Sequence, residues 1–294
     1  MERLEILKTY KIYIGGQFPR TESGRYYPLN DKKGKVIANI CLSSKKDARN
    51  AVLAARKAFG PWSERTAFNR GQILYRIAEM LEGRREQFIA ELQVQGKSKV
   101  EAVKELDFSI DRIVYYAGWA DKYLQVLSSV NPVASSHFNF SSLEPTGVVG
   151  ILAPKNSSLL GLVSLVMPVI VGGNTCVVLS SASMPLCAIT FAEVLNSSDL
   201  PGGVVNILTG DVNETIGTLS SHMDINAIAF ATTEQKISIV IENNAVLNIK
   251  RLRDFSSTVW ELDESQNLHS IADFQEVKTT WHPIENIGGA SSSY

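Results

Sequence analysis

The chain has 294 residues, enough for one large domain or two modest ones with a packed core. Hydrophobic residues make up 45% of the sequence and charged residues 20%, proportions that are ordinary for a globular protein. With 29 Lys and Arg against 30 Asp and Glu, the net charge of -1 favours neither nucleic acid nor an anionic membrane as a partner.

The cysteines and histidines predict neither a disulfide framework nor a metal site. The three cysteines are widely spaced without a CxxC pair, and the four histidines lack metal-ligand spacing. The charged N-terminus has no apolar core of a secretory signal. The longest apolar run, residues 159–171, is too short to span a bilayer and is interrupted by Ser164 and Pro168. These features favour the cytoplasm and no membrane partner.

The first third of the chain predicts a short hairpin followed by helices. Residues 11–18 have strand character around a Gly15-Gly16 break. Ser44, with Asp47 three residues later, is a typical N-cap pattern ahead of a helical apolar stripe. Further stripes predict helices over 73–81, over 88–92 and, as one long helix, over 99–127.

From Gly147 onward, short apolar strands alternate with helices, which predicts an α/β fold with a Rossmann-like parallel sheet. The predicted strands are 147–154, 174–179, 203–208 and 226–230, with helices at 158–171, 185–195 and 213–219. Open sheets of this kind bind ligands beyond the carboxyl ends of their strands. Those ends are residues 154–156, 180–182, 209–210 and 231–233.

The tail is less regular. Residues 257–262 predict a fifth strand, and residues 274–281 alternate polar and apolar side chains like a half-buried strand. The small, polar residues 288–294 are predicted to be disordered. The chain therefore divides into an N-terminal layer of strands and helices (1–146), a sheet domain (147–262) and a C-terminal tail (263–294).

General nucleotide-binding and hydrolase motifs are absent from the chain, since it contains no GxGxxG, GxxxxGK[ST], GxSxG or HExxH. Residue spacing alone predicts an α/β domain with a nucleotide crevice and goes no further.

Seven segments in sequence order resemble the NAD(P)-dependent aldehyde dehydrogenase family. They are YIGGQF (13–18), the stretch AVLAARKAFGPW and its continuation (51–81), YYAGWADK (115–122), EPTGVVGILAPKN (144–156), GNTCVVL (173–179), LPGGVVNILTG (200–210) and HMDINAIAFATTE (222–234). The resemblance extends over about residues 11–262 and implies a Rossmann-like domain that takes NAD or NADP.

In this family a cysteine thiolate attacks the aldehyde, an asparagine of a Pro-Trp-Asn motif donates to the oxyanion, and a glutamate activates water. The motif reads Pro154-Lys155-Asn156 here, so Asn156 takes the asparagine position, with a helix N-cap as the alternative role. Glu261, next to Trp260, is the best match for the glutamate, with a solvated strand-end carboxylate as the alternative.

The resemblance places cofactor-binding positions at Pro154, Ser180, Thr232 and Thr233. Ser180 stands where the family has a lysine that binds the adenosine ribose, and serine supplies neither the charge nor the reach. Residues 230–234 match the phosphate-binding segment without its glycine, which lets the backbone approach phosphate closely. Thr233 offers a hydroxyl there, with an N-cap of the next helix as the alternative. We therefore expect weak NAD(P) binding.

The cysteine-bearing catalytic domain of the family has no counterpart in the chain, and none of the cysteines falls at the nucleophile position. Residues 275–283 resemble the family's C-terminal strand, and residues 136–143 lie where it has the other half of an oligomerisation hairpin. We expect a catalytically inactive assembly or regulatory subunit that forms a homo-oligomer or joins a full-length aldehyde dehydrogenase. Two alternatives remain: an oxidoreductase completed by a partner chain, and a dinucleotide-binding sensor.

Overall fold

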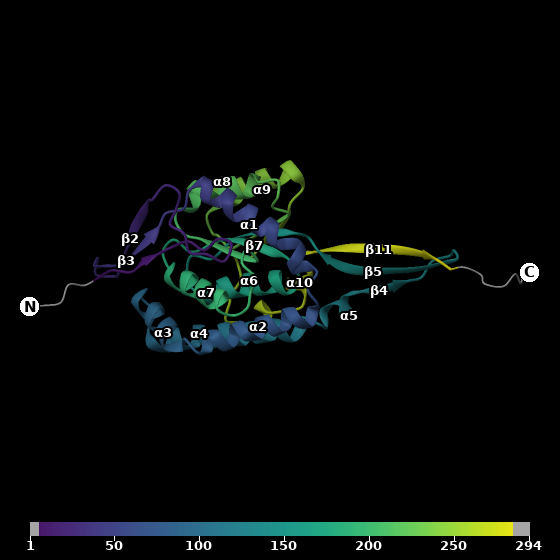
Figure 1. Cartoon of the computed structure of the whole chain (residues 1–294), viewed down its shortest axis with the longest axis horizontal. Helices are drawn as coiled ribbons and strands as arrows, with labels where there is room; N and C mark the ends of the chain where they lie inside the picture. The colour runs from purple at the N-terminus through teal and green to yellow at the C-terminus, as the bar shows by residue number, and fades with distance from the viewer. Residues whose placement is uncertain (1–5, 285–294) are drawn as a thin grey trace, which may run out of the picture.

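Five parallel strands form the central sheet, in the order β10-β9-β6-β7-β8 (Figure 1). The computed structural model describes residues 6–284, so the disorder predicted for 288–294 lies outside the described residues. The strands are β6 (Val148–Leu152), β7 (Thr175–Leu179), β8 (Val205–Leu208), β9 (Ala227–Phe230) and β10 (Arg251–Asp254). All residues of the first four are buried, as expected for apolar strands covered on both faces. The predicted Rossmann-like sheet is confirmed.

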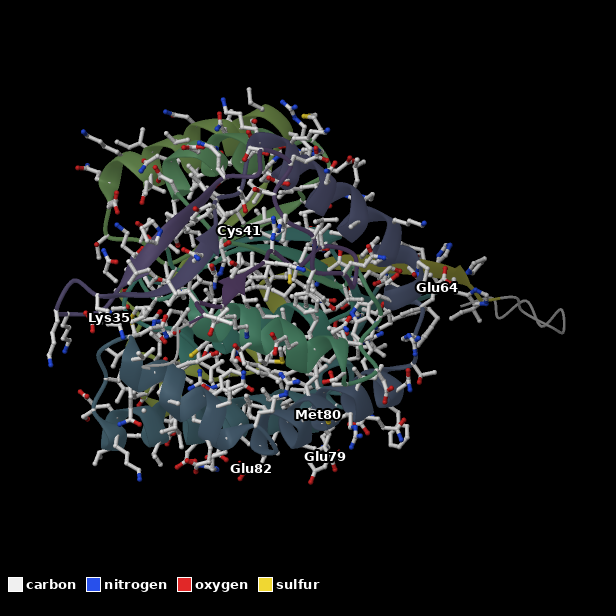
Figure 2. All side chains as sticks on the ribbon, turned by 60° about the vertical axis from the view of Figure 1, so that its left-hand side comes forward. Lys35, Cys41, Glu64, Glu79, Met80 and Glu82 are labelled. Carbon is white, nitrogen blue, oxygen red and sulfur yellow. The ribbon has the colours of Figure 1, made fainter. Side chains whose placement is uncertain are left out.

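Helices cover both faces of this sheet. On one face lie α1 (Lys45–Ser63), α8 (Val212–Ser221) and α9 (Gln235–Ala245). On the other lie α6 (Leu160–Val171) and α7 (Leu186–Asn196), and outside them pack α2 (Ala67–Glu82), α3 (Arg85–Val94) and α4 (Lys99–Trp119) (Figure 1). Figure 2 shows Glu79 and Glu82 of α2 on the outer surface of this layer and Cys41 inside the body. The predicted helical layer is thereby confirmed.

The start of α1 follows the predicted N-cap pattern. Asp47 N–H donates to Ser44 Oγ at 3.3 Å, and Ser44 N–H donates to Asp47 Oδ2 at 2.7 Å, which makes a reciprocal capping box. Gly15 and Gly16 form the predicted turn with φ of +62° and +82°, but only isolated bridges flank it, so the hairpin is smaller than expected.

A second sheet, which the sequence did not predict, precedes α1 in the chain. It consists of β1 (Thr9–Tyr10), β3 (Val36–Cys41) and β2 (Tyr26–Asn30), with β1 parallel and β2 antiparallel to the central β3.

Two further predictions were wrong. Residues 257–262 are not a strand; the fifth strand is β10, whose charged sequence RLRD suits the edge of the sheet. The long helix predicted over 99–127 ends with α4 at Trp119 and resumes as α5 (Tyr123–Leu127). Bonds between residues three apart, from Ala120 N–H to Ala117 O and from Lys122 N–H to Trp119 O, tighten and end the first helix.

A third sheet projects from the body as a long arm (Figure 1). It consists of β4 (Ser129–Asn131), β5 (His137–Pro145) and β11 (Gln275–Pro283), and we call it the flange. β5 and β11 pair antiparallel along their whole length, from Gln275 opposite Pro145 to Pro283 opposite His137. The strands expected near 136–143 and 274–281 are therefore present and pair within one chain.

Candidate functional site

The order of the central sheet reverses between β6 and β9. In open α/β sheets the loops that leave the carboxyl ends of the strands at such a point diverge and leave a crevice for a ligand. A cavity of about 210 Å³ lies there. Its lining comes from three loops: Pro154, Lys155 and Asn156 after β6; Ala231, Thr232 and Thr233 after β9; and Phe255, Ser256, Thr258 and Trp260 after β10.

Four of the six residues singled out from the sequence meet in this cavity, namely Pro154, Asn156, Thr232 and Thr233. Ser180 and Glu261 are not among the residues that line it. Ser180 directly follows β7 and is buried, and its N–H donates to Leu208 O at 2.9 Å. Its hydroxyl finds no partner among residues 6–284.

Asn156 does not cap the helix that follows it. α6 begins at Leu160, and its first amides are satisfied by other side chains. Glu105 Oε1 accepts from the N–H groups of Leu159 and Leu160 at 3.0 and 3.3 Å, and Ser157 Oγ accepts from Gly161 N–H at 2.8 Å. The N-cap alternative for Asn156 is therefore wrong, and its exposed side chain stands beside the cavity.

Sequence reasoning missed Glu105, which fixes the loop after β6. Its carboxylate is 5% exposed, accepts from Ser157 Oγ at 3.0 Å and pairs with Lys97 Nζ at 2.7 Å. The sequence pattern could have identified Glu105, because an acidic residue within the buried stripe of a helix is rarely tolerated without partners.

The start of α9 uses Thr232 rather than Thr233. Thr232 Oγ1 accepts from Glu234 N–H at 3.1 Å, and the N-cap residue Glu234 makes no side-chain cap bond. The N-cap alternative for Thr233 is therefore wrong. Thr232 N–H in turn donates to Ser256 Oγ at 3.1 Å, which ties the loop after β9 to the loop after β10.

An ion pair at the mouth of the cavity was not foreseen. Lys155 Nζ, from the loop after β6, pairs with the carboxylate of Glu234, at the start of α9. The two side chains are 59% and 40% exposed, so water screens their attraction.

Glu261 is exposed in a turn beyond β10, and the carboxylate at the end of that strand belongs to Asp254. Asp254 Oδ1 accepts from Ser256 N–H at 2.8 Å. The neighbouring Trp260 is buried and held by Arg112, whose guanidinium donates to the Trp260 carbonyl at 3.0 Å. The lining itself contains no carboxylate that could act as a base.

The cysteines lie inside the body. Cys41, Cys176 and Cys187 are free and buried, and none lines the cavity. Burial raises the pKa of the Cys176 and Cys187 thiols well above the ordinary value, so both are neutral near pH 7. Within residues 6–284 there is no cluster of histidine, cysteine and acidic side chains suited to a metal ion, and no helix of the length and apolarity that a membrane span needs.

Comparison with known proteins identifies relatives over most of the chain. The model of the aldehyde dehydrogenase family matches residues 19–253. Cytosolic aldehyde dehydrogenase 1 of Elephantulus edwardii is 32% identical over 249 residues, which cover 82% of this chain and 49% of the relative. Omega-crystallin of Enteroctopus dofleini is 32% identical over 251 residues, or 83% of this chain and 50% of the relative.

Solved structures give the same result. The NAD+ complex of an aldehyde dehydrogenase from Bacillus cereus superposes with a TM-score of 0.79 at 27% identity, covering 84% of this chain and 50% of that one. Betaine aldehyde dehydrogenase from Staphylococcus aureus, in complex with NAD+, has a TM-score of 0.79 at 26% identity, with coverage of 83% and 49%.

Proposed function

This chain belongs to the aldehyde dehydrogenase family and spans about half the length of the curated relatives it matches; we propose that it is a non-enzymatic assembly or regulatory subunit. The observation that carries the proposal is the burial of its thiols. Covalent aldehyde chemistry begins with an accessible thiolate, whereas Cys176 and Cys187 are neutral and enclosed. Asn156 alone would then hold a family catalytic position at the crevice, while Glu261 lies away from it.

The same proposal includes weak or undetectable NAD(P) binding. Ser180 lacks the charge of the lysine that the family uses, which corresponds to a loss of about ten- to a hundredfold in affinity. The cavity of about 210 Å³ is also smaller than the roughly 300–1,000 Å³ of pockets that enclose drug-sized ligands. Calorimetry that gave low-micromolar NAD affinity would instead favour the sensor alternative.

The flange is the proposed assembly surface. On one of its faces Val277 and Trp281 are 68% and 57% exposed, and on the other Val130 and Phe138 are also exposed. Apolar side chains exposed on both faces of a projecting sheet favour association with another subunit. A second copy of this chain is the proposed partner, with a full-length aldehyde dehydrogenase as the second candidate. By analogy with the cytosolic relative, we place this assembly in the cytoplasm.

Light scattering tests this proposal. The paired substitution Val277→Lys with Trp281→Lys should convert the oligomer to a monomer at micromolar concentration, because like charges would have to be buried without partners. Leu53→Lys, which changes an equally exposed apolar residue on α1, is the matched control and should keep the oligomer. A native chain that is itself a stable monomer contradicts the proposal.

Activity gives an independent test. The isolated chain should produce no NADH from simple aldehydes. If the native chain produced NADH steadily and Glu261→Ala abolished that production, the chain would be an enzyme and Glu261 would take part in its reaction.

A further inference from the structure

A second cavity, of about 240 Å³, lies beside the sheet of β1, β2 and β3, at the end of the body opposite the flange (Figure 1). It shares no lining residue with the crevice between β6 and β9, and we call it the N-terminal cavity. Its lining comes from the three strands and from the loop before β2, and includes Thr9, Arg20, Thr21, Arg25, Tyr26 and Asn39.

The strands give the N-terminal cavity an uncharged polar wall. Asn39 lies opposite Thr9 in the sheet. It alternates along β3 with the buried Ala38 and Ile40, so its side chain lies on the face away from the core. Among residues 6–284 the side chains of Thr9, Tyr26 and Asn39 have no hydrogen-bond partner. These groups are therefore available to a ligand.

The loop before β2 supplies two cations. Arg20 is exposed, and its guanidinium has no partner within the described residues. Arg25 donates to the two carboxylate oxygens of Glu214 at 3.3 and 2.6 Å, and to Ser23 Oγ at 3.4 Å. Since a guanidinium has five N–H groups, these bonds leave two of them without an acceptor in that part of the chain.

The acidic side chains nearby do not compensate these cations. None of them is among the residues that line the N-terminal cavity, all of which belong to the described range. Glu22, in the same loop, pairs with Lys46 at 2.9 Å. Asp47 Oδ2 accepts from Ser44 N–H at 2.7 Å. Cations beside free neutral hydrogen-bonding groups favour an anionic ligand.

The loop that carries the arginines is held in one shape. Gly24 N–H donates to Thr21 O at 3.0 Å, and the positive φ of Gly24, +66°, closes this turn. Thr21 Oγ1 donates to Arg25 O at 3.2 Å. Glu22 N–H donates to Asp47 Oδ1 at 3.0 Å, which ties the loop to the start of α1. A loop that is ordered beforehand loses little conformational entropy when a ligand binds.

The chemistry and the size of the N-terminal cavity limit its ligand. The planar fork of a guanidinium matches the oxygens of a carboxylate or phosphate group. About 240 Å³ is less than the roughly 300–1,000 Å³ of pockets that enclose drug-sized ligands, so the ligand has to be small.

We propose that the N-terminal cavity binds a small oxyanion, with a carboxylate or phosphate group held by Arg20 and Arg25 and by the amide of Asn39. The inference does not depend on the assembly role, because the flange contributes nothing to this lining.

Calorimetric titration of the full chain tests the proposal with succinate, inorganic phosphate and the neutral analogue succinamide as probes. Arg20→Gln should weaken binding of the anions by about tenfold or more, since it removes a charge-assisted hydrogen bond. Arg49→Gln, which makes the same charge change at an exposed arginine of α1 outside the lining, is the matched control and should leave the affinity unchanged.

A second variant tests the wall of the cavity. Asn39→Asp keeps the shape of the side chain and should weaken binding by about tenfold or more, since it sets a negative charge against the anion. Thermal melting of each variant checks that the fold is intact.

The probes also distinguish the sources of the oxyanion. Tighter binding of succinate supports a small carboxylic acid as the ligand, and tighter binding of phosphate supports the inorganic anion. Equal affinity in Arg20→Gln and Arg49→Gln would overturn the proposal, as would succinamide that binds as tightly as succinate. The absence of binding of succinate and phosphate to the native chain at millimolar concentration would also overturn it.

Discussion

Replacement of Glu105 by alanine should destabilise the chain more than any surface substitution. The carboxylate is 5% exposed. It accepts hydrogen bonds from Ser157 Oγ and from two backbone amides at the start of α6, and it forms an ion pair with Lys97. Each buried donor that loses its acceptor costs about 1–3 kcal/mol, and breaking a buried ion pair costs about 3–5 kcal/mol. Lys97 is 23% exposed and can turn toward water, so the expected loss is about 3 kcal/mol in the free energy of unfolding.

Glu105→Gln separates the contribution of the hydrogen bonds from that of the ion pair with Lys97. Its amide oxygen can still accept from Ser157 and the α6 amides, while the charge opposite Lys97 is lost, so the expected cost is about 1 kcal/mol. Urea denaturation measures both variants against Asp111→Ala, an exposed carboxylate on the same helix. If Glu105→Ala costs no more than Asp111→Ala, Glu105 does not hold the loop after β6, and the account of that loop is wrong.

Three further outcomes are expected. Cys176 and Cys187 should react with a thiol reagent only as the chain unfolds, since burial raises the pKa of both thiols; rapid reaction of the native protein would contradict this. Arg112→Met should free the segment around Trp260, whose fluorescence should shift to longer wavelength and whose neighbourhood should become cleavable by protease. Burial lowers the pKa of Lys250 to about 8, below its unfolded value, so the unfolded chain binds more protons between these values and stability should rise with pH above about 8. Lys250→Met should flatten that rise in denaturation curves measured from pH 7 to 9.5.

The strands of the central sheet were predictable where burial made them apolar. β6 to β9 are continuous runs of buried residues, which leave a clear pattern in the sequence. β10 leaves no such pattern because it is an edge strand whose arginines pair with distant residues: Arg251 with Glu276 and Arg253 with Asp273. The apolar residues of 257–262 led the prediction to the wrong segment. Trp260 is buried and its carbonyl accepts from Arg112 of α4, whereas Val259 and Leu262 are 55% and 52% exposed.

The sequence was enough to locate the cavity from the ends of the strands, but it did not show that Lys155 pairs with Glu234 beside it. Pro154, Asn156 and the two threonines follow directly from where β6 and β9 end. Lys155 and Glu234 are 79 residues apart, and nothing local in the sequence joins them. Residues that act over such separations, Glu105 included, become visible only when the helices are placed against the sheet.

The tail belongs to the body as much as to the flange, and this decides how assembly should be tested. Phe274 and Gln275 are both buried at the base of β11. Asn174 Nδ2 donates to the Phe274 carbonyl at 2.9 Å, and Gln275 Nε2 donates to the Gly172 carbonyl at 3.1 Å. Deleting residues 274–294 would leave these buried polar groups without partners, so the truncated chain should lose stability as well as any oligomeric contact.

A fall in both mass and stability would therefore not identify an interface. Substitutions at Val277 and Trp281, which point into solvent beyond this anchor, change the surface and leave the anchor in place. A deletion that left the unfolding curve unchanged would show that the anchor contributes nothing, and truncation would then be a valid test of assembly.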